Sequence, residues 1–265
     1  MRLTIVGATG SMSGPDGAAS CYLVQATGFD AELQEDRVWS LVLDIGPGAF
    51  GQLWRYMDPR DVDAVLVSHG HPDHLADIMS LEVFLKWHPH GARPGTRVIG
   101  PKDIPHRIAQ IEGYGDDAGV STFYDFDTAG SGEVFNVGPF SIRTFPGFHT
   151  VESYGFRIEG PSDTHPGRTV SIAYTGDTDL CAPMFQMAQG VDLLLSECGF
   201  TSAMQARGIH LSGARAGLLA KESGAKQLVI THIQPWTDPE IPRAEVAAVL
   251  GRAPDIAVPG ATWMV

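Results

Sequence analysis

Six consecutive residues constrain this chain more than any other stretch: His69-Gly70-His71-Pro72-Asp73-His74. The largely apolar run 63–68, directly before them, predicts a strand. A helix is predicted after them from apolar residues at helical spacing, namely Leu75, Ile78, Leu81 and Leu85. Imidazole nitrogens and a carboxylate crowded onto the turn between a strand and a helix suit a borderline-soft divalent cation such as zinc. The sequence therefore predicts a metal site at this turn.

Three other predicted strands end in residues that can join this site. His149 follows the strand 139–146, Asp177 follows the strand 169–175, and His232 follows the strand 227–230. Each of these histidines alone is more often structural than a ligand, but their occurrence together with the first turn favours a ligand role. The chain thus offers seven candidate metal ligands: His69, His71, Asp73, His74, His149, Asp177 and His232.

Seven donors are too many for one cation and suit two. A single four-coordinate ion cannot use them all, whereas two ions can if one carboxylate bridges them and each keeps an open position for water. Two ions about 3.5–4 Å apart would share a hydroxide, lower its pKa to about 7, and clamp the oxygens of a phosphorus or carbonyl centre. The pattern therefore indicates a hydrolytic site with two divalent metal ions.

The order of the predicted elements indicates an α/β fold. Many strands come first, strands alternating with helices follow, and both halves contain strands whose ends carry polar residues. A length of 265 residues allows one large domain or two small ones. We expect two sheets packed face to face with helices outside, forming a single domain over residues 1–265 with the site at the strand ends.

Several local features have an ordinary structural interpretation. The glycine-rich stretch 7–17 lacks the spacing of a dinucleotide or phosphate loop, so it predicts either a hairpin connection or a loop that lines the site. Residues 113–119 are expected to form a loop. Ser212 and Gly224 are suited to cap a helix over 213–223. Surface positions are expected for the histidines in polar turns: His88, His90, His106 and His165.

Composition limits the partners and the compartment. A net charge of −13 does not favour a long nucleic acid, because proteins that bind many phosphates usually carry a basic patch. No apolar run is long enough to cross a membrane, and no signal peptide is evident. Cys21, Cys181 and Cys198 are too scattered for a disulfide framework and suit a reducing cytosol, so we expect a cytoplasmic protein without a membrane partner.

The sequence resembles the metallo-β-lactamase superfamily over nearly its whole length. The stretch 69–74 is similar to the family's H-x-H-x-D-H signature, and His149, the stretch 174–178 and Thr231-His232 are similar to its later ligand motifs. The resemblance implies a four-layer αββα sandwich. It also implies that His69, His71 and His149 hold one metal, that Asp73, His74 and His232 hold the other, and that Asp177 bridges them.

Within the superfamily the chain looks like the branch that contains tRNase Z and related phosphodiesterases. The similarity lies in Ser196-Glu197-Cys198 and in the stretch 208–212. It implies that His210 approaches the scissile phosphate and that Glu197 orients it. A histidine held by a carboxylate is in any case a tuned proton donor or phosphate clamp. The alternative is that His210 merely flanks a helix and Glu197 lies at the edge of the core.

One departure from tRNase Z bears on the substrate. Those enzymes typically insert a long arm that grips tRNA between the third histidine and the bridging aspartate, whereas His149 and Asp177 are only 28 positions apart. Further similarity, through the stretches 19–23, 210–213 and 231–236, is to atypical bacterial cyclic-nucleotide phosphodiesterases. This resemblance implies a small nucleotide substrate such as 3′,5′-cyclic AMP. The alternatives are a tRNA 3′-end endonuclease, an ester or thioester hydrolase, and a non-catalytic metal-binding module.

The roles implied by the resemblance complete the prediction. Asp73 would orient the nucleophile as well as bind metal, and His210 or a metal-bound water would protonate the departing 3′ oxygen. Trp236 would either stack on a base or pack into the rim of the site. Zinc is the first expectation for the two divalent ions, with manganese and iron as alternatives, since His and Asp donors suit all three. A homodimer is expected only by analogy with relatives.

Overall fold

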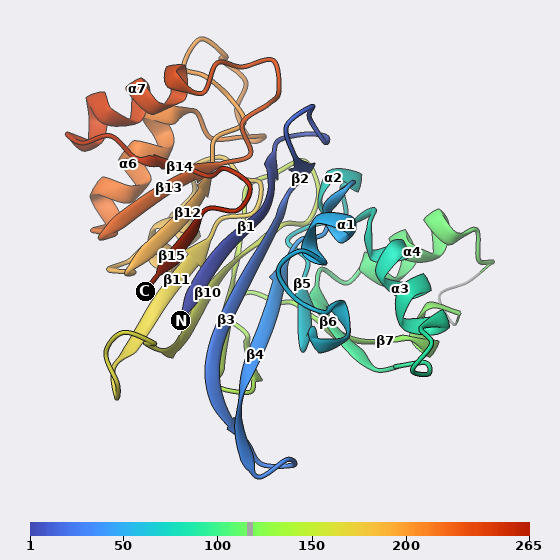
Figure 1. Ribbon diagram of the computed structural model, residues 1–265. Helices are drawn as coiled ribbons and strands as arrows, with labels where there is room; N and C mark the ends of the chain where they lie inside the picture. The colour runs from blue at the N-terminus through green and yellow to red at the C-terminus, as the bar shows by residue number, and fades with distance from the viewer. Residues whose placement is uncertain (116–118) are drawn as a thin grey trace.

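The computed structural model describes residues 1–115 and 119–265 and has four layers. Two sheets lie face to face in the middle, and helices cover the outer face of each sheet (Figure 1). The predicted αββα sandwich is therefore confirmed. Of the predicted loop 113–119, residues 116–118 lie outside the described part of the chain.

The first sheet contains mainly the N-terminal half of the chain. Its strands occur in the order β15 (Thr262–Met264), β1 (Arg2–Thr9), β3 (Cys21–Asp30), β4 (Glu35–Leu43), β5 (Ala64–Leu66), β6 (Thr96–Gly100) and β7 (Tyr124–Thr128), with β2 (Ala18–Ala19) beside β1. The strands β4 to β7 are mutually parallel, so their carboxyl ends lie on one edge. The hairpin of β3 and β4 extends below the body of the molecule in Figure 1.

The second sheet contains the C-terminal half. Its order is β14 (Asp255–Ile256), β13 (Gln227–Thr231), β12 (Leu193–Glu197), β11 (Thr169–Tyr174), β10 (Tyr154–Pro161), β9 (Phe140–Pro146) and β8 (Val134–Val137). The strands β11 to β14 are parallel. The antiparallel pair β10 and β11 is joined directly by residues 162–168, so no arm is inserted there.

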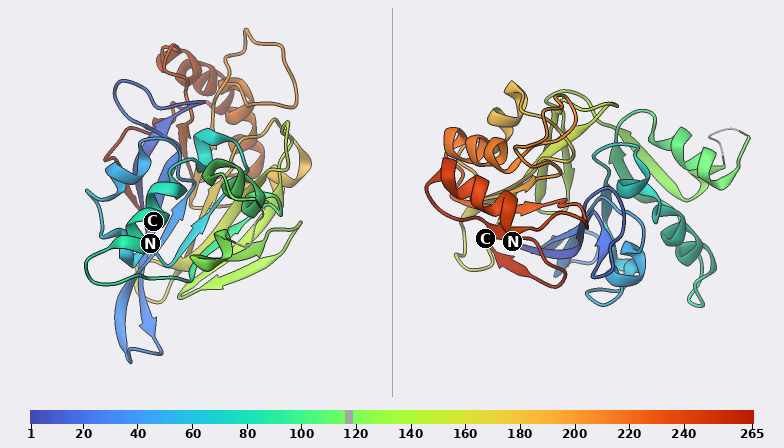
Figure 2. Two further views of the ribbon diagram at one scale, coloured as in Figure 1. Left: turned by 90° about the vertical axis from the view of Figure 1, so that its right-hand side faces the viewer. Right: turned by 90° about the horizontal axis from the view of Figure 1, so that it is seen from above.

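The helices divide between the two outer layers. Figure 2 shows the N-terminal and the C-terminal helices on opposite sides of the sheets. The N-terminal layer contains α1 (Ala49–Leu53), α2 (Pro72–Leu75), α3 (Ile78–Trp87) and α4 (Ile104–Glu112), and the C-terminal layer contains α5 (Ala182–Ala188), α6 (Gly213–Ser223) and α7 (Glu240–Leu250). Among the described residues no helix is long and apolar enough to span a bilayer.

Two predicted elements differ in detail. The helix predicted after the histidine turn divides into α2 and α3, because the backbone N–H of Asp77 leaves the helical pattern and donates to Ile45 O at 3.0 Å. The strand predicted near 120–125 begins only at Tyr124. Residues Val120–Thr122 form a 3-10 turn instead, in which Thr122 Oγ1 donates to Gly119 O at 2.8 Å. The sequence patterns did not predict α5.

Apolar side chains fill the spaces between all four layers. In β4, Leu41 and Leu43 face the opposite sheet while Val42 faces the N-terminal helices, as the two-residue period of a strand requires. In the second sheet, Leu194 packs against α6 and α7, whereas Leu195 faces the first sheet. Each fully buried side chain of this size contributes about 1.5–3 kcal/mol relative to exposure. The packed layers hold the ends of the two sheets in register.

The carboxyl ends of the central strands of both sheets lie on one side of the sandwich. The loops that follow β12 and β13 gather at the upper side of Figure 1, where α2 also lies. Isolated pairings tie these loops to one another: His69 pairs with Ser153, and Thr9 pairs with Ile233. This common edge is where all the predicted site residues come together.

Candidate metal centre

The histidine turn begins where β5 ends. His69 and His71 lie in extended backbone, so both project to the same side of the turn. Pro72 then occupies the first turn of α2, a position that proline favours because it lacks an N–H to pair. Asp73 and His74 follow within α2. The turn therefore delivers all four side chains toward the seam between the two sheets.

Three histidines form the first cluster, here called the three-histidine cluster: His69, His71 and His149. His69 Nε2 lies 3.0 Å from His71 Nδ1, and His149 Nε2 lies 3.1 Å from the same nitrogen. The opposite nitrogens of two of these rings are held by the protein. His149 Nδ1 donates to Ile209 O at 2.7 Å, and His69 Nδ1 donates to Ser68 Oγ at 3.0 Å. The Nε2 lone pairs of His149 and His69 therefore point into the cluster.

The second cluster, here called the mixed cluster, contains Asp73, His74, Asp177 and His232. His74 Nε2 lies 3.2 Å from His232 Nε2, and Asp73 Oδ2 lies 3.3 Å from the first nitrogen and 3.2 Å from the second. The structure thus brings together all seven residues predicted as ligands, in the two groups that the sequence comparison implied.

Asp177 lies between the two clusters. Its Oδ1 is 3.3 Å from His74 Nε2, while its Oδ2 is 3.4 Å from His232 Nε2 and 3.9 Å from His69 Nε2. The preceding Gly176 has φ +56°, and a Cβ there would lie 2.7 Å from Ser68 Cβ. Glycine is therefore needed at this position to place the carboxylate.

The donor set fits divalent cations. Asp177 Oδ1 is buried without a hydrogen-bond partner, an expensive arrangement unless something else satisfies it. Imidazole nitrogens that face one another at 3.0 to 3.2 Å cannot all be satisfied by protons, but they can share cations. His and Asp clusters of this kind suit divalent metal ions.

The two clusters differ in charge. Burial, reinforced by neighbouring histidines, lowers the pKa of His69 well below its ordinary value, and burial also lowers the pKa values of His71 and His149. In the mixed cluster burial opposes ionisation of the Asp177 carboxyl group, but the neighbouring histidines outweigh this effect. His232 and His74 hold the pKa of Asp177 well below its usual range. The three-histidine cluster is therefore neutral, and the mixed cluster contains the carboxylates.

His210 and Glu197 form a buried pair beside Asp177. His210 Nδ1 donates to Glu197 Oε1 at 3.1 Å and lies 3.6 Å from Asp177 Oδ2. Glu197 is fixed by two backbone N–H donors, Thr178 at 2.9 Å and Gly199 at 2.8 Å. Burial alone would lower the pKa of His210, but the attraction and hydrogen bond of Glu197 raise it to about 9. The predicted pair therefore exists, and in the metal-free protein its imidazole carries a proton at neutral pH.

Asp44 is a functional residue that the sequence reasoning did not single out. Its carboxylate is fully buried and accepts from Ser68 N at 2.7 Å, Ser68 Oγ at 2.8 Å, His74 Nδ1 at 2.7 Å and Tyr174 OH at 2.6 Å. It thereby fixes the ring orientation of His74 directly and that of His69 through Ser68. The signal was present, because the sequence predicts a strand over 38–44 that ends in Asp44, and the other site residues also lie at the ends of predicted strands.

Strained backbone marks the same region. Among the described non-glycine residues with positive φ are Ser11 at 65°, Asp44 at 56° and His232 at 59°. Ser11 N lies 3.3 Å from His232 Nε2, so the glycine-rich loop lines the site, as one of its two interpretations predicted. Trp236 is 62% exposed and is not packed into the rim.

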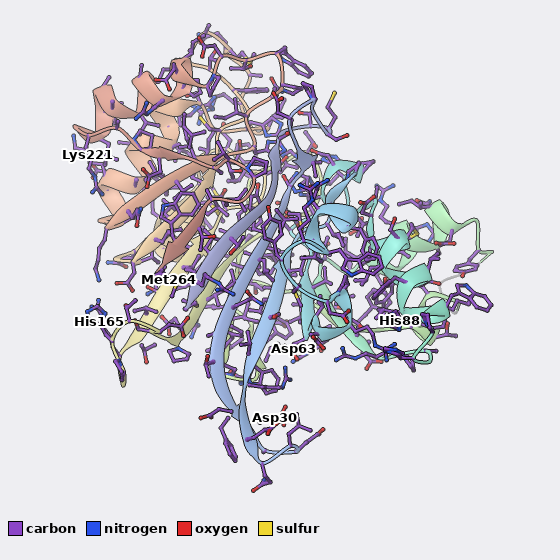
Figure 3. All side chains as sticks on the ribbon, in the orientation of Figure 1. Asp30, Asp63, His88, His165, Lys221 and Met264 are labelled. Atoms are coloured by element: carbon purple, nitrogen blue, oxygen red, sulfur yellow. The ribbon has the colours of Figure 1, made fainter. Side chains whose placement is uncertain are left out.

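The other histidines lie elsewhere. Figure 3 shows His88 beside the N-terminal helices and His165 at the turn between β10 and β11, far apart from each other. His88, His90, His106 and His165 belong to none of the candidate metal groups found among the described residues. His90, His106 and His165 are exposed, as predicted, whereas His88 is partly buried.

The chain is similar to several known proteins in sequence. Residues 40–233 match a family model described as a beta-lactamase superfamily domain. An uncharacterized protein of Mycobacterium tuberculosis is 36% identical over 245 residues, which is 91% of this chain and 83% of that protein. Ribonuclease BN of Escherichia coli is 27% identical over 244 residues, with coverages of 72% and 77%.

A relative of similar length links the sequence and the fold. The probable metallo-hydrolase YhfI of Bacillus subtilis is 28% identical over 272 residues, with 99% of each chain covered. The crystal structure of the metallo-beta-lactamase fold protein YhfI matches this chain with a TM-score of 0.82 at 26% identity, covering 100% of this chain and 99% of that chain.

Proposed function

This chain belongs to the beta-lactamase superfamily and is a metallo-hydrolase of the metallo-beta-lactamase fold, and from that premise we propose that it hydrolyses a small nucleotide phosphodiester. The bond to be cleaved is that of a 3′,5′-cyclic nucleotide such as cyclic AMP. The metal sites are the three-histidine cluster and the mixed cluster, with Asp177 shared between them.

One observation carries the proposal: the buried His210–Glu197 pair stands beside the bridging carboxylate. Its histidine is held at 3.1 Å by Glu197 and lies 3.6 Å from Asp177 Oδ2, within reach of a group bound at the metals. Cleavage of a phosphodiester requires a proton for the departing alkoxide, next to the metals. Thioester or lactone hydrolysis does not need such a phosphate clamp, so the pair favours phosphorus over acyl chemistry.

The chain's own residues take distinct roles. Two divalent cations, when bound, would polarise the phosphoryl group and lower the pKa of a coordinated water to about 7. Asp73 would hold a cation of the mixed cluster and would also orient the attacking oxygen. His210 would donate the proton of Nε2 to the departing 3′ oxygen, and Glu197 would hold its ring in place through Nδ1. Asp44 keeps His74, and His69 through Ser68, in the ligating orientation.

Two observations support a small substrate. The connection between β10 and β11 is only residues 162–168, so there is no arm at that place to hold a folded RNA. The net charge of −13 does not favour a long polyanion. Trp236, four positions after His232, and Phe148, directly before His149, are 62% and 50% exposed, and we propose that they stack on a single base.

The native metal and the assembly are part of the proposal. Three neutral imidazoles in one cluster favour zinc, and the carboxylates of the mixed cluster also accept manganese or iron. We propose a homodimer as the assembly, with no membrane partner.

A second candidate is an RNA 3′-end endonuclease. The similarity to Ribonuclease BN favours it, and the same clusters and histidine pair would serve that reaction. It differs from the first candidate in the size of the substrate rather than in the chemistry.

The test is direct. Purified protein loaded with zinc or manganese is incubated with cyclic AMP, with a precursor tRNA and with a thioester. Hydrolysis of cyclic AMP, lost in Asp177→Ala together with part of the metal content, is the expected result. Cleavage of the precursor tRNA alone, or of the thioester alone, would replace the proposed substrate with that alternative.

A further inference from the structure

His210 lies at the end of a long irregular loop. This segment, here called the rim loop, comprises residues 199–211 between β12 and α6, at the upper side of Figure 1. Residues 202–207 are exposed and form no regular element. Loops of this kind are ordinarily the least stable part of a fold. Something outside the loop must hold His210 in place.

Asp179 supplies that anchor. Its carboxylate is fully buried, two residues beyond Asp177, and accepts four hydrogen bonds. Oδ2 accepts from Arg207 Nε at 2.5 Å and from Gly208 N at 2.9 Å, both in the rim loop. Oδ1 accepts from Arg215 Nη1 at 2.5 Å, on α6, and from Leu180 N at 2.8 Å. One carboxylate thus joins the rim loop to α6 and to the segment of Asp177.

A third segment is tied to the same anchor. Asp179 N donates to Phe148 O at 2.7 Å, and Phe148 N donates to Thr178 Oγ1 at 2.8 Å. The Phe148 ring lies over Gly208, since a Cβ there would be 2.8 Å from Phe148 Cζ. Gly208 also has φ +73°, so no other residue fits this contact without strain. The segments 147–149, 177–180 and 207–210 therefore form one unit.

We infer that Asp179 is a positioning residue for His210, acting through the rim loop. Its place is argued from its four bonds and their partners, and its effect on catalysis rests on the proposed function. The two arginines differ in exposure, with 64% of the Arg207 side chain exposed and 15% of that of Arg215. Arg215 therefore holds the Asp179 carboxylate from the buried side, and the hydrogen bonds from Arg207 and Gly208 attach the rim loop to that carboxylate.

A matched control exists at the opposite end of β12. Asp192 accepts from Arg168 Nη2 at 3.1 Å, from Lys226 Nζ at 2.7 Å and from Ser171 N at 2.9 Å. It therefore resembles Asp179 in having two cations and a backbone donor. None of its partners belongs to the site.

The first experiment measures order without catalysis. Amide hydrogen exchange is followed over residues 200–210 in the full-length protein, with and without bound zinc. Asp179→Asn is expected to raise the exchange rate there at least tenfold, Arg207→Ala about threefold, and Asp192→Asn not at all. Exchange in the rim loop that is unchanged by Asp179→Asn, or raised equally by Asp192→Asn, would overturn the inference. Arg207→Ala decides the matter if Asp179→Asn does not fold, because its side chain is mostly exposed.

The second experiment separates positioning from general damage. Hydrolysis of cyclic AMP, whose departing 3′ alkoxide requires a proton, is measured in Asp179→Asn, His210→Ala and the double variant, each with its zinc content determined. In the wild-type background we expect Asp179→Asn to lower kcat at least tenfold and to change KM less than threefold. In the His210→Ala background we expect the same substitution to lower kcat less than threefold. An equal loss in both backgrounds would mean that Asp179 acts independently of His210. If no variant or wild type hydrolyses the ester, the proposed function fails, while the exchange experiment still decides the inference.

Discussion

Asp44 and Asp179 are both fully buried carboxylates that belong to neither metal cluster, but they are balanced by different charges. Asp44 is surrounded by hydroxyls, an amide and His74, and among the described residues no lysine or arginine forms an ion pair with it. Asp179 is paired with two arginines of its own chain. The negative charge of Asp44 is therefore balanced only through the metal ligands, whereas that of Asp179 is balanced by arginines.

The difference separates two kinds of support for the same centre. Asp44 orients ligands, so its contribution is linked to the cations that those ligands bind. Asp179 is neutralised within the chain, so it can hold the rim loop whether or not metal is present. Four predictions test this contrast.

The largest effect is expected for Asp44→Ala. The substitution leaves the buried donors Ser68 N and Tyr174 OH without an acceptor and releases the His74 ring. We expect a loss of about 3–5 kcal/mol in the free energy of unfolding and weaker binding of the second zinc equivalent. Urea denaturation and metal titration measure these quantities. A loss below about 1 kcal/mol would show that the Asp44 network matters little.

Removal of metal should affect the two regions unequally. A chelator is expected to lower the stability of the metal-loaded protein by about 4 kcal/mol, as for a ligand near a thousand times its Kd. Amide exchange should rise around Ser68 and His69, while that of residues 202–208 should change less than twofold. Equal rises in both regions would contradict the proposed independence of the Asp179 anchor.

Glu197→Gln tests the charge on His210 in the metal-free protein. Without the carboxylate, burial is no longer opposed, so the pKa of His210 should fall from about 9 to its ordinary value or below. In the wild-type protein the folded-state pKa of His210 is raised, so its interaction with Glu197 stabilises the fold. This contribution to the free energy of unfolding is fully present below about pH 6.5 and is lost as pH rises through about 9. Its size is on the order of 2–3 kcal/mol. NMR titration of the imidazole and unfolding at pH 6 and pH 10 provide the check.

The smallest effects are expected within the Asp179 anchor. Arg215→Ala removes the better buried guanidinium and should cost about 1–2 kcal/mol of stability, whereas Arg207→Ala should cost less than about 0.5 kcal/mol. Thermal unfolding of both variants at neutral pH ranks them. A larger loss for Arg207→Ala would reverse the roles assigned to the two arginines.

The sequence predicted the clusters well because their residues follow strands. Once the strand ends share an edge, His69, His149 and His232 must come close together, and the periodicity of the apolar residues is enough to locate those ends. The same argument would have found Asp44. It was missed because a lone aspartate two positions before Gly46-Pro47-Gly48 also has an ordinary interpretation as a turn residue.

Asp179 and Arg207 could not be found in this way. Arg207 lies in a stretch without periodicity, and its partner is 28 positions away, so no spacing rule connects them. The break between α2 and α3 was missed for a similar reason, since it depends on a bond from Asp77 to Ile45. Contacts between irregular segments are set by tertiary packing, which local patterns do not record.

The short connection between β10 and β11 has a consequence for engineering. Residues 163–168 are exposed, and His165 marks their position at the far end of the sheets from the histidine turn (Figure 3). Lengthening an exposed loop costs little, because loop-closure entropy grows only slowly with length. A fluorescent reporter or a recruitment module inserted after His165 should leave hydrolysis intact. The protein can thus be directed to a new binding partner without any change to its active site.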